Sequence, residues 1–283
     1  MQALEAAVAE TANPWPLRRE RATELAGRYQ HAAEMLRLYQ ALVAVQERAY
    51  LETLHPVKPE FPSAWGPSQL VDFAVEHVLP QVVDATVASG PIRLRDGVIG
   101  VFCSADLPGL VRRWLQNEPL TPFETYLARA SVSPVLEGLP RSALPSLSLP
   151  HAGWVGEEVS DRICPSCGGL PQVSYFAVSG EALVSGPRYL VCSRCATNWI
   201  FSRMTCAGCG ETDGTKLPIF QDEKQIPHLR VDGCRSCNRY LLTVDLRRDA
   251  RAVPVVDELA ALPLDLYAID QGLTKISPNL LGN

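Results

Sequence analysis

Eight of the nine cysteines in this 283-residue chain lie between residues 164 and 237, where they form four Cys-x-x-Cys pairs. The pairs are Cys164/Cys167, Cys192/Cys195, Cys206/Cys209 and Cys234/Cys237. They are separated by 24, 10 and 24 residues, so the two long gaps are equal and form an internal repeat. Two such turns brought together by a hairpin complete a tetrahedral cage of four thiolates. We therefore predict that the first two pairs bind one metal ion and the last two pairs a second.

Metal binding is favoured over the other roles that paired cysteines take. A dithiol oxidoreductase normally uses one such pair near a helix N-terminus, and a disulfide framework is typical of oxidising compartments. The residue after each second cysteine is Gly168, Ala196, Gly210 or Asn238. Three of these four are types that tolerate the left-handed backbone of a metal knuckle. The alternatives are structural free thiols, catalytic dithiols, and an interleaved pairing of the first pair with the third.

The composition describes a folded, water-soluble protein. Hydrophobic residues make up 47% and charged residues 20%, which excludes disorder as the main state. The longest apolar runs fall far short of the roughly 18 residues of a membrane span. The sequence shows no secretory signal, and we therefore expect a cytoplasmic protein. The formal net charge of −5, with eleven basic and nine acidic residues between 161 and 250, makes nucleic acid an unlikely partner.

Helical patterns precede the cysteines, and short strand-like runs surround them. Apolar spacing predicts one long helix or a broken pair over 17–54, a helical stretch from Pro67 to Gly90, and helices over 106–118 and 122–137. A Pro- and Ser-rich segment at 138–150 predicts a linker and a domain boundary. The predicted strands cover 173–178, 188–191, 198–201, 217–220, 228–231 and 240–244. A helical tail over 253–273 should be kinked or divided at Pro263.

No other residues form a recognisable catalytic constellation. The sequence contains no Gly-rich phosphate loop, Ser-His-Asp pattern or His-Glu metal helix, and its five histidines are scattered singly. Most simply they are solvated or core side chains, while His151 and His228 lie near enough to the cysteines to support a metal site. Cys103 is interpreted as a buried small hydrophobe. Several arginines near the cysteines either are simply solvated or form a ridge that meets an acidic partner: Arg188, Arg194, Arg203, Arg235 and Arg239.

The C-terminal part resembles a known family, the formate dehydrogenase accessory proteins called FdhE. The similarity covers about 115 residues. It begins with Cys164-Pro165-Ser166-Cys167-Gly168 and with Arg188-Tyr189-Leu190 before the second pair, and it continues through both remaining pairs. It ends with Asp257-Glu258-Leu259-Ala260, Leu264-Asp265 and Asn279, whereas Pro263 departs from the family pattern. The N-terminal half matches only in length and helical character.

The resemblance implies an α+β protein: an N-terminal all-α helical domain, two tandem rubredoxin-like or zinc-ribbon β modules, and a C-terminal helical segment. The expected boundaries are 1–150, 151–203, 204–250 and 251–283. It also implies iron as the metal, although the thiolate ligands suit zinc equally well.

The implied function is an accessory factor, not an enzyme, that binds the catalytic subunit of respiratory formate dehydrogenase in the cytoplasm. The alternatives are a rubredoxin-like one-electron redox protein and a nucleic-acid-binding zinc ribbon. Association with a second copy of the chain stays open.

Overall fold

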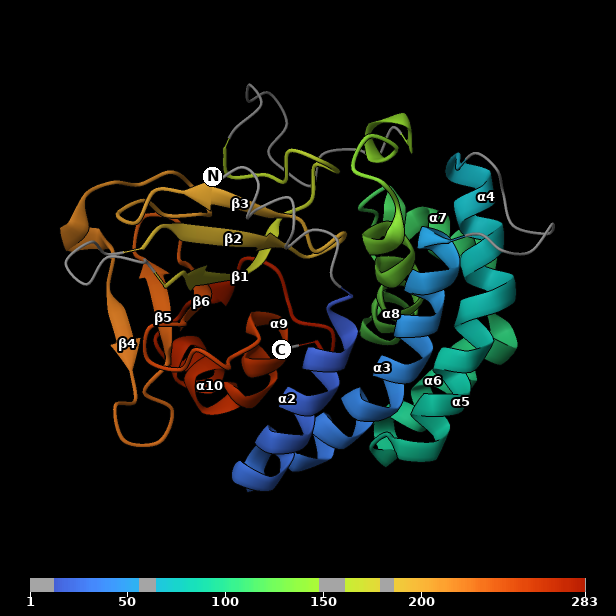
Figure 1. Ribbon diagram of the computed structural model, residues 1–283, viewed down its shortest axis with the longest axis horizontal. Helices are drawn as coiled ribbons and strands as arrows, with labels where there is room; N and C mark the ends of the chain where they lie inside the picture. The colour runs from blue at the N-terminus through green and yellow to red at the C-terminus, as the bar shows by residue number, and fades with distance from the viewer. Residues whose placement is uncertain (1–12, 56–64, 148–160, 179–185, 283) are drawn as a thin grey trace.

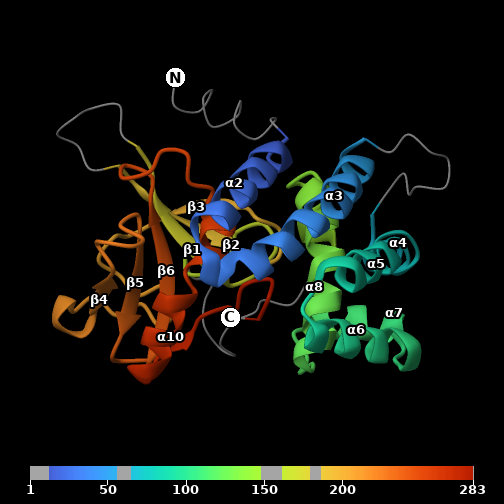
Figure 2. The same ribbon diagram turned by 90° about the horizontal axis from the view of Figure 1, so that it is seen from below.

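The computed structural model describes residues 13–55, 65–147, 161–178 and 186–282. Helices α3 to α8 stand together on one side of the molecule, and a twisted sheet stands on the other (Figure 1). Helix α2 lies between these helices and the sheet when the molecule is seen from below (Figure 2). We call residues 13–147 the helical half and residues 161–282 the strand half. Within the described ranges, no helix has both the length and the apolar character that crossing a bilayer requires.

The helical half contains the helices α2 Trp15–Arg28, η1 Gln30–Ala32, α3 Ala33–Leu54, α4 Pro67–Phe73, η2 Ala74–Val78, α5 Leu79–Ser89, α6 Ile92–Ser104, α7 Leu107–Leu115, α8 Pro122–Gly138 and η3 Leu144–Leu147. The predicted stretch over 17–54 is therefore a broken pair of helices. Its break is at Tyr29, which is extended and directly precedes η1. One turn of π-helix, η2, joins α4 to α5.

Local capping explains where two of the predicted helices begin. The Thr121 hydroxyl accepts a hydrogen bond from the Glu124 backbone amide, and the Glu124 carboxylate accepts one from the Thr121 amide. This reciprocal pair satisfies two of the donors that the first turn of α8 leaves unbonded. In the same way Asp106 accepts a hydrogen bond from the Gly109 amide at the start of α7.

Helix α6 was not predicted from the sequence. It contains Gly97 and Gly100, which lower helix propensity, and Val98 is its one fully buried residue. With one buried residue, the helix has no apolar stripe from which it could have been predicted. The Gly97 backbone lies against Phe123 of α8, where a Cβ would come within 2.5 Å of the ring. The glycine thus permits a close helix contact at the expense of local helix propensity.

The strand half contains one sheet with the strands β1 Pro171–Phe176, β2 Arg188–Cys192, β3 Asn198–Phe201, β4 Ile219–Gln221, β5 Leu229–Cys234, β6 Arg239–Asp245 and β7 Thr274–Lys275. Each of the six predicted strands is present: β3 has its predicted bounds, the other five differ at one or both ends, and β7 is additional. The strand order is β3-β2-β1-β6-β5-β4, with β7 paired to β6. β1 and β6 are parallel, with Val173 opposite Leu242, and this pairing joins the two predicted β modules in one sheet.

The two faces of this sheet have different neighbours. Alternate residues such as Val173, Val231 and Leu242 pack with α2, α3 and the C-terminal helices α9 Pro254–Asp257 and α10 Leu262–Asp270. Leu190 and Leu241 point to the opposite face, where they form a small cluster with Phe201, Ala207 and Ile276. This alternation follows from the two-residue period of a strand.

The C-terminal tail is divided as predicted. After α9 the chain forms one 3-10 turn, η5 Glu258–Ala260, and Pro263 stands in the first turn of α10. Proline is tolerated there because the amide that it lacks has no partner inside the helix. The predicted linker at 138–150 is described only to residue 147. In that part Leu139, Leu144 and Leu147 are buried with the helical half, and the domain boundaries stay predictions.

Candidate metal centres

The sheet presents the same cysteine arrangement twice. In each three-strand unit, one Cys-x-x-Cys turn precedes the first strand and the other lies between the second and third strands. Thus Cys192 is the last residue of β2 and Cys234 is the last residue of β5. The first cysteine group consists of Cys164, Cys167, Cys192 and Cys195, and the second of Cys206, Cys209, Cys234 and Cys237. The structure therefore brings together the pairs that the equal spacing grouped, not the interleaved ones.

Each turn has the same backbone conformation at the residue after its second cysteine. The φ angles are positive at all four positions: Gly168 69°, Ala196 53°, Gly210 80° and Asn238 54°. The amides of Gly168 and Gly210 each donate to the carbonyl of the first cysteine of their turn, at 2.9 Å. Backbone amides also approach the sulfurs directly: Arg194 N lies 3.4 Å from Cys192 Sγ, and Gly208 N lies 3.3 Å from Cys206 Sγ. Amides that point at sulfur favour its thiolate form.

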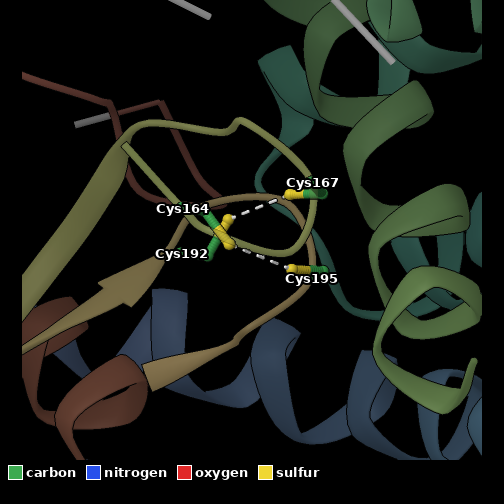
Figure 3. A group of neighbouring side chains, drawn as sticks. All are labelled: Cys164, Cys167, Cys192 and Cys195. Atoms are coloured by element: carbon green, nitrogen blue, oxygen red, sulfur yellow. Dashed lines mark hydrogen bonds between the residues drawn. The ribbon is translucent and has the colours of Figure 1, made fainter. Parts of the chain in front are cut away.

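The sulfur atoms are spaced as ligands of one tetrahedral ion. In the first group the Sγ atoms of Cys164 and Cys195 are 3.7 Å apart, and those of Cys167 and Cys192 are 3.4 Å apart (Figure 3). The corresponding distances in the second group are 3.8 and 3.7 Å. A tetrahedral ion with metal–sulfur bonds of about 2.3 Å requires sulfur–sulfur distances of about 3.8 Å. Each group thus fits one zinc or iron ion.

Burial opposes the ionised form of several of these thiols. It raises the pKa of Cys192 well above the ordinary thiol value and raises that of Cys206 to about 11. Several adjacent thiolates would also repel one another in this water-poor environment. A metal ion supplies the positive charge that holds coordinating thiols deprotonated. The donor set and the burial therefore both suit a bound metal.

The two groups differ in their exposure to solvent. All four cysteines of the first group are buried, none with more than 5% of its surface exposed. In the second group Cys209 and Cys237 are partly exposed. The first group belongs to the hydrophobic core of the helical half, whereas the second lies beside the opposite face of the sheet. An ion in the first group would be enclosed between the two halves of the molecule.

Two arginines connect the first group to the helical half. Arg194, inside the second turn of the group, donates to the Leu115 carbonyl at the end of α7 at 3.0 Å. It also donates to the side chain of Asn117. Arg141, which follows α8, donates to the Cys195 carbonyl at 3.0 Å. The knuckles are thus held both by their own hairpins and by hydrogen bonds across the boundary between the halves.

In the second group, hydrogen bonds to one carboxylate connect the two turns instead. The Glu211 carboxylate accepts hydrogen bonds from the Ser236 hydroxyl at 2.6 Å and from the Lys216 ammonium at 3.2 Å. Because Glu211 follows one knuckle and Ser236 lies inside the other, this contact joins the two turns. The hydrogen bonds from Ser236, from the Asp213 amide and from Lys216 lower the pKa of Glu211 to about 2.

The other residues singled out from the sequence lie elsewhere. Cys103 is exposed on α6, so its interpretation as a buried hydrophobe was wrong. His228 is buried, and its Nε2 lies 2.8 Å from Asp257 Oδ1 rather than against a cysteine. His151 lies outside the described residues. Of the five arginines of the expected ridge, Arg194 contacts the helical half and Arg235 is exposed. The other three line a cavity.

Comparison with known proteins places this segment in a family. Residues 163–203 match the family model described as the FdhE central domain, and residues 204–281 match the FdhE C-terminal domain. Over residues 163–281 the chain is similar to the FdhE family. These are the residues that carry both cysteine groups, so the resemblance inferred from the Cys-x-x-Cys pairs is confirmed.

Individual FdhE proteins support the same assignment. The chain is 35% identical over 119 residues to a protein FdhE homolog of Aquifex aeolicus, covering 42% of this chain and 41% of that protein. It is 33% identical over 168 residues to a homolog of Stutzerimonas stutzeri, covering 54% and 53%. The chain thus spans about half the length of the curated relatives it matches.

A solved structure extends the likeness of fold to the helical half. The crystal structure of the FdhE protein from Pseudomonas aeruginosa is 24% identical to this chain. Its TM-score is 0.66, with 96% of this chain and 97% of that chain covered. The mixed helix-and-sheet architecture with an N-terminal helical half is therefore the fold of FdhE.

The sequence did not show which side chains surround the two cysteine groups. Arg194 was identified only as a member of a surface ridge, and Arg141 was not singled out. Both form their contacts across more than 50 positions of chain. No periodic pattern signals such contacts, because they depend on how the helical half docks against the sheet.

Proposed function

We propose that this protein is an accessory factor in the biogenesis of formate dehydrogenase, which it assists by binding the catalytic subunit without turnover chemistry of its own. The observation that carries the proposal is the coincidence of the FdhE-family segment with both cysteine groups. In this account the eight cysteines bind two metal ions, iron or zinc. The ions hold the knuckles of the strand half in shape for docking, because short strands and long turns bury little apolar surface by themselves.

The proposed docking surface lies on the strand half near β3. Ile200 of β3 is 66% exposed and Met204, just beyond this strand, is 62% exposed. We infer that these two exposed apolar side chains contribute to the docking surface, because interaction surfaces carry exposed apolar side chains. Both residues follow the second knuckle of the first cysteine group, so a metal-stabilised turn would present them to the partner.

A pull-down under anaerobic conditions tests the proposal, with the full chain as bait and the formate dehydrogenase catalytic subunit as prey. We expect the wild-type chain to retain the subunit and Ile200→Asp to weaken retention severalfold, because a charge is placed in an apolar contact. The matched control is Ile92→Asp, since Ile92 is 70% exposed on α6 of the helical half. Absence of retention by the wild type, together with normal formate dehydrogenase activity in a deletion strain, would refute the proposed function.

One observation favours a second candidate function, that of a rubredoxin-like electron carrier. The partly exposed Cys209 and Cys237 would bring an iron ion of the second group close to solvent, as one-electron exchange requires. A redox titration of the protein as isolated under anaerobic conditions distinguishes the two functions. Reversible bleaching of a red form at a biological potential supports electron transfer, whereas a colourless zinc form supports the docking scaffold.

A further inference from the structure

A cavity of about 450 Å³ opens beside the second cysteine group, on the sheet face that α9 and α10 leave uncovered. Leu241 of β6 and Ile276 lie in its wall, and Cys206 and Ala207 of the knuckle form another side. Its volume lies within the range of small-molecule binding pockets, roughly 300 to 1,000 Å³. The cavity shares a wall with the second cysteine group, because Cys206 lines it.

Positive charge is concentrated in this cavity. Five arginines line it, from β2, β5, β6 and the segments after β3 and β6: Arg188, Arg203, Arg230, Arg239 and Arg247. Among the described residues, Asp232 is the one acidic side chain in the lining. The rest of the wall is largely apolar and includes Met204 and Ile219.

Three of the guanidinium groups surround one aromatic ring. The Cζ atoms of Arg203, Arg230 and Arg247 lie 4.5, 4.7 and 5.2 Å from the ring centroid of Phe176. Each cation is attracted to the electron-rich face of the ring, but the three cations repel one another. The ring thus gathers positive charge that the protein must neutralise in another way.

The nearby carboxylates neutralise only part of this charge. Asp232 is shared between Arg188 at 3.1 Å and Arg230 at 2.8 Å. Asp245 pairs with Arg247 at 2.5 Å. In the described part of the chain, Arg203 has no carboxylate within ion-pair distance. Burial and the charges of Arg247 and Arg230 lower the pKa of Arg203, which agrees with an excess of positive charge at this place.

We propose that this pocket binds a small organic phosphate of about mononucleotide size, which goes beyond the formate dehydrogenase role. The phosphate would accept hydrogen bonds from Arg203 and its neighbours Arg230 and Arg247, and the organic part would lie against Met204 and Leu241. Guanidinium groups match phosphate oxygens in a bidentate manner, and a dianion offsets more of the excess charge than one carboxylate does.

The distribution of charge separates this ligand from a nucleic-acid strand. The segment 161–250 has only two more basic than acidic residues, so the arginines are gathered in one cavity rather than spread along a surface. A polymer needs a track of basic side chains that follows its backbone. A half-enclosed cavity with an apolar wall suits a single small anion instead.

The three methionines of the chain provide a direct test. In protein labelled with ¹³C at the methionine methyl groups, Met204 reports on the cavity wall and Met35 of α3 serves as an internal reference. Titration with AMP or GMP should shift the Met204 signal, assigned with Met204→Leu, and leave Met35 in place. The affinity should exceed that for inorganic phosphate and for adenosine, and it should fall with added salt.

Substitution of Arg203 localises the binding. Arg203→Gln should weaken AMP binding by about tenfold or more, since a charge-assisted hydrogen bond is lost. Arg112→Gln, an exposed arginine on α7, should leave it unchanged. An unshifted melting temperature shows that Arg203→Gln still folds.

Four outcomes overturn the proposal. These are no Met204 shift with either nucleotide, equal affinity for phosphate alone, equal affinity for adenosine, and a shift produced only by an acidic peptide such as hexa-aspartate. Because the titration requires no formate dehydrogenase, its failure would leave the pull-down result unaffected.

Discussion

Ala196 has a φ of 53°, in the left-handed region, although an alanine Cβ is unfavourable there. The other knuckles place glycine or asparagine at the same position, with Asn238 as its equivalent in the second cysteine group. The turn after Cys195 therefore holds a strained residue that its surroundings must stabilise. Ala196 lines a small cavity between the two halves of the molecule.

Ala196→Gly should stabilise the metal-loaded protein by about 0.5 to 1 kcal/mol. Relief of the left-handed strain exceeds the entropy that glycine adds to the unfolded chain. Asn238→Gly is the matched control and should change the free energy of unfolding by less, because asparagine tolerates this conformation. Denaturant titrations of the three proteins make the comparison. A loss of stability in Ala196→Gly would show that its methyl group matters more for packing than for strain.

The cysteines of the two candidate metal centres could be predicted from the sequence, whereas the side chains that surround them could not. Spacing alone grouped the eight cysteines, because a short turn and a hairpin impose strong local geometry. The exposure of Cys103 could not be predicted, because an isolated cysteine within an apolar run is usually a buried core residue. The arginine cavity could not be predicted for a different reason. Its five arginines come from three strands and two connecting segments, and only the order of the strands in the sheet brings them together.

Helix α2 connects the two halves through a buried ion-pair network. Arg21 of α2 donates to Asp257 of α9 at 2.5 to 3.1 Å and to Asp249 at 2.7 Å. Asp257 is fully buried and also accepts from the Val253 amide at 2.7 Å. Although burial opposes the charge of Arg21, the hydrogen bonds to Asp257 and Asp249 raise its pKa. Such a network is costly to break one partner at a time.

Arg21→Ala should lower the free energy of unfolding by about 3 kcal/mol or more, because it leaves the Asp257 carboxylate buried without its main counter-charge. Arg19→Ala is the matched control on the same helix. Arg19 is half exposed and pairs with Glu47, so its loss should cost less than about 1 kcal/mol. Chemical denaturation followed by circular dichroism measures both. Similar losses for the two variants would show that the network does not hold α2 to the strand half.

The elements were easier to predict than their arrangement. The capping residues Thr121 and Asp106 and the break before Pro263 lie in the sequence next to what they control. By contrast, the parallel pairing of β1 with β6 joins strands about 70 positions apart and has no local signal. The sequence therefore predicted two β modules but not the single sheet that they form.

The whole molecule encloses the first cysteine group between its halves and leaves the second near the surface. We expect a chelator in excess to remove metal in two phases, with the second group emptied first. Release from the first group requires the halves to separate, since its cysteines are buried in the core of the helical half. A colorimetric chelator assay follows both phases. Cys206→Ser should abolish the fast phase, and a single phase in the wild type would contradict the difference in enclosure.

The metal content of the intact chain tests the central claim most directly. The protein is purified under reducing, anaerobic conditions, and its iron and zinc are quantified by elemental mass spectrometry against protein concentration. Two tetrahedral thiolate groups predict about two ions per chain, and the double variant Cys206→Ser/Cys209→Ser should retain about one. A folded wild-type chain with metal near zero and eight titratable thiols in the strand half would contradict the account.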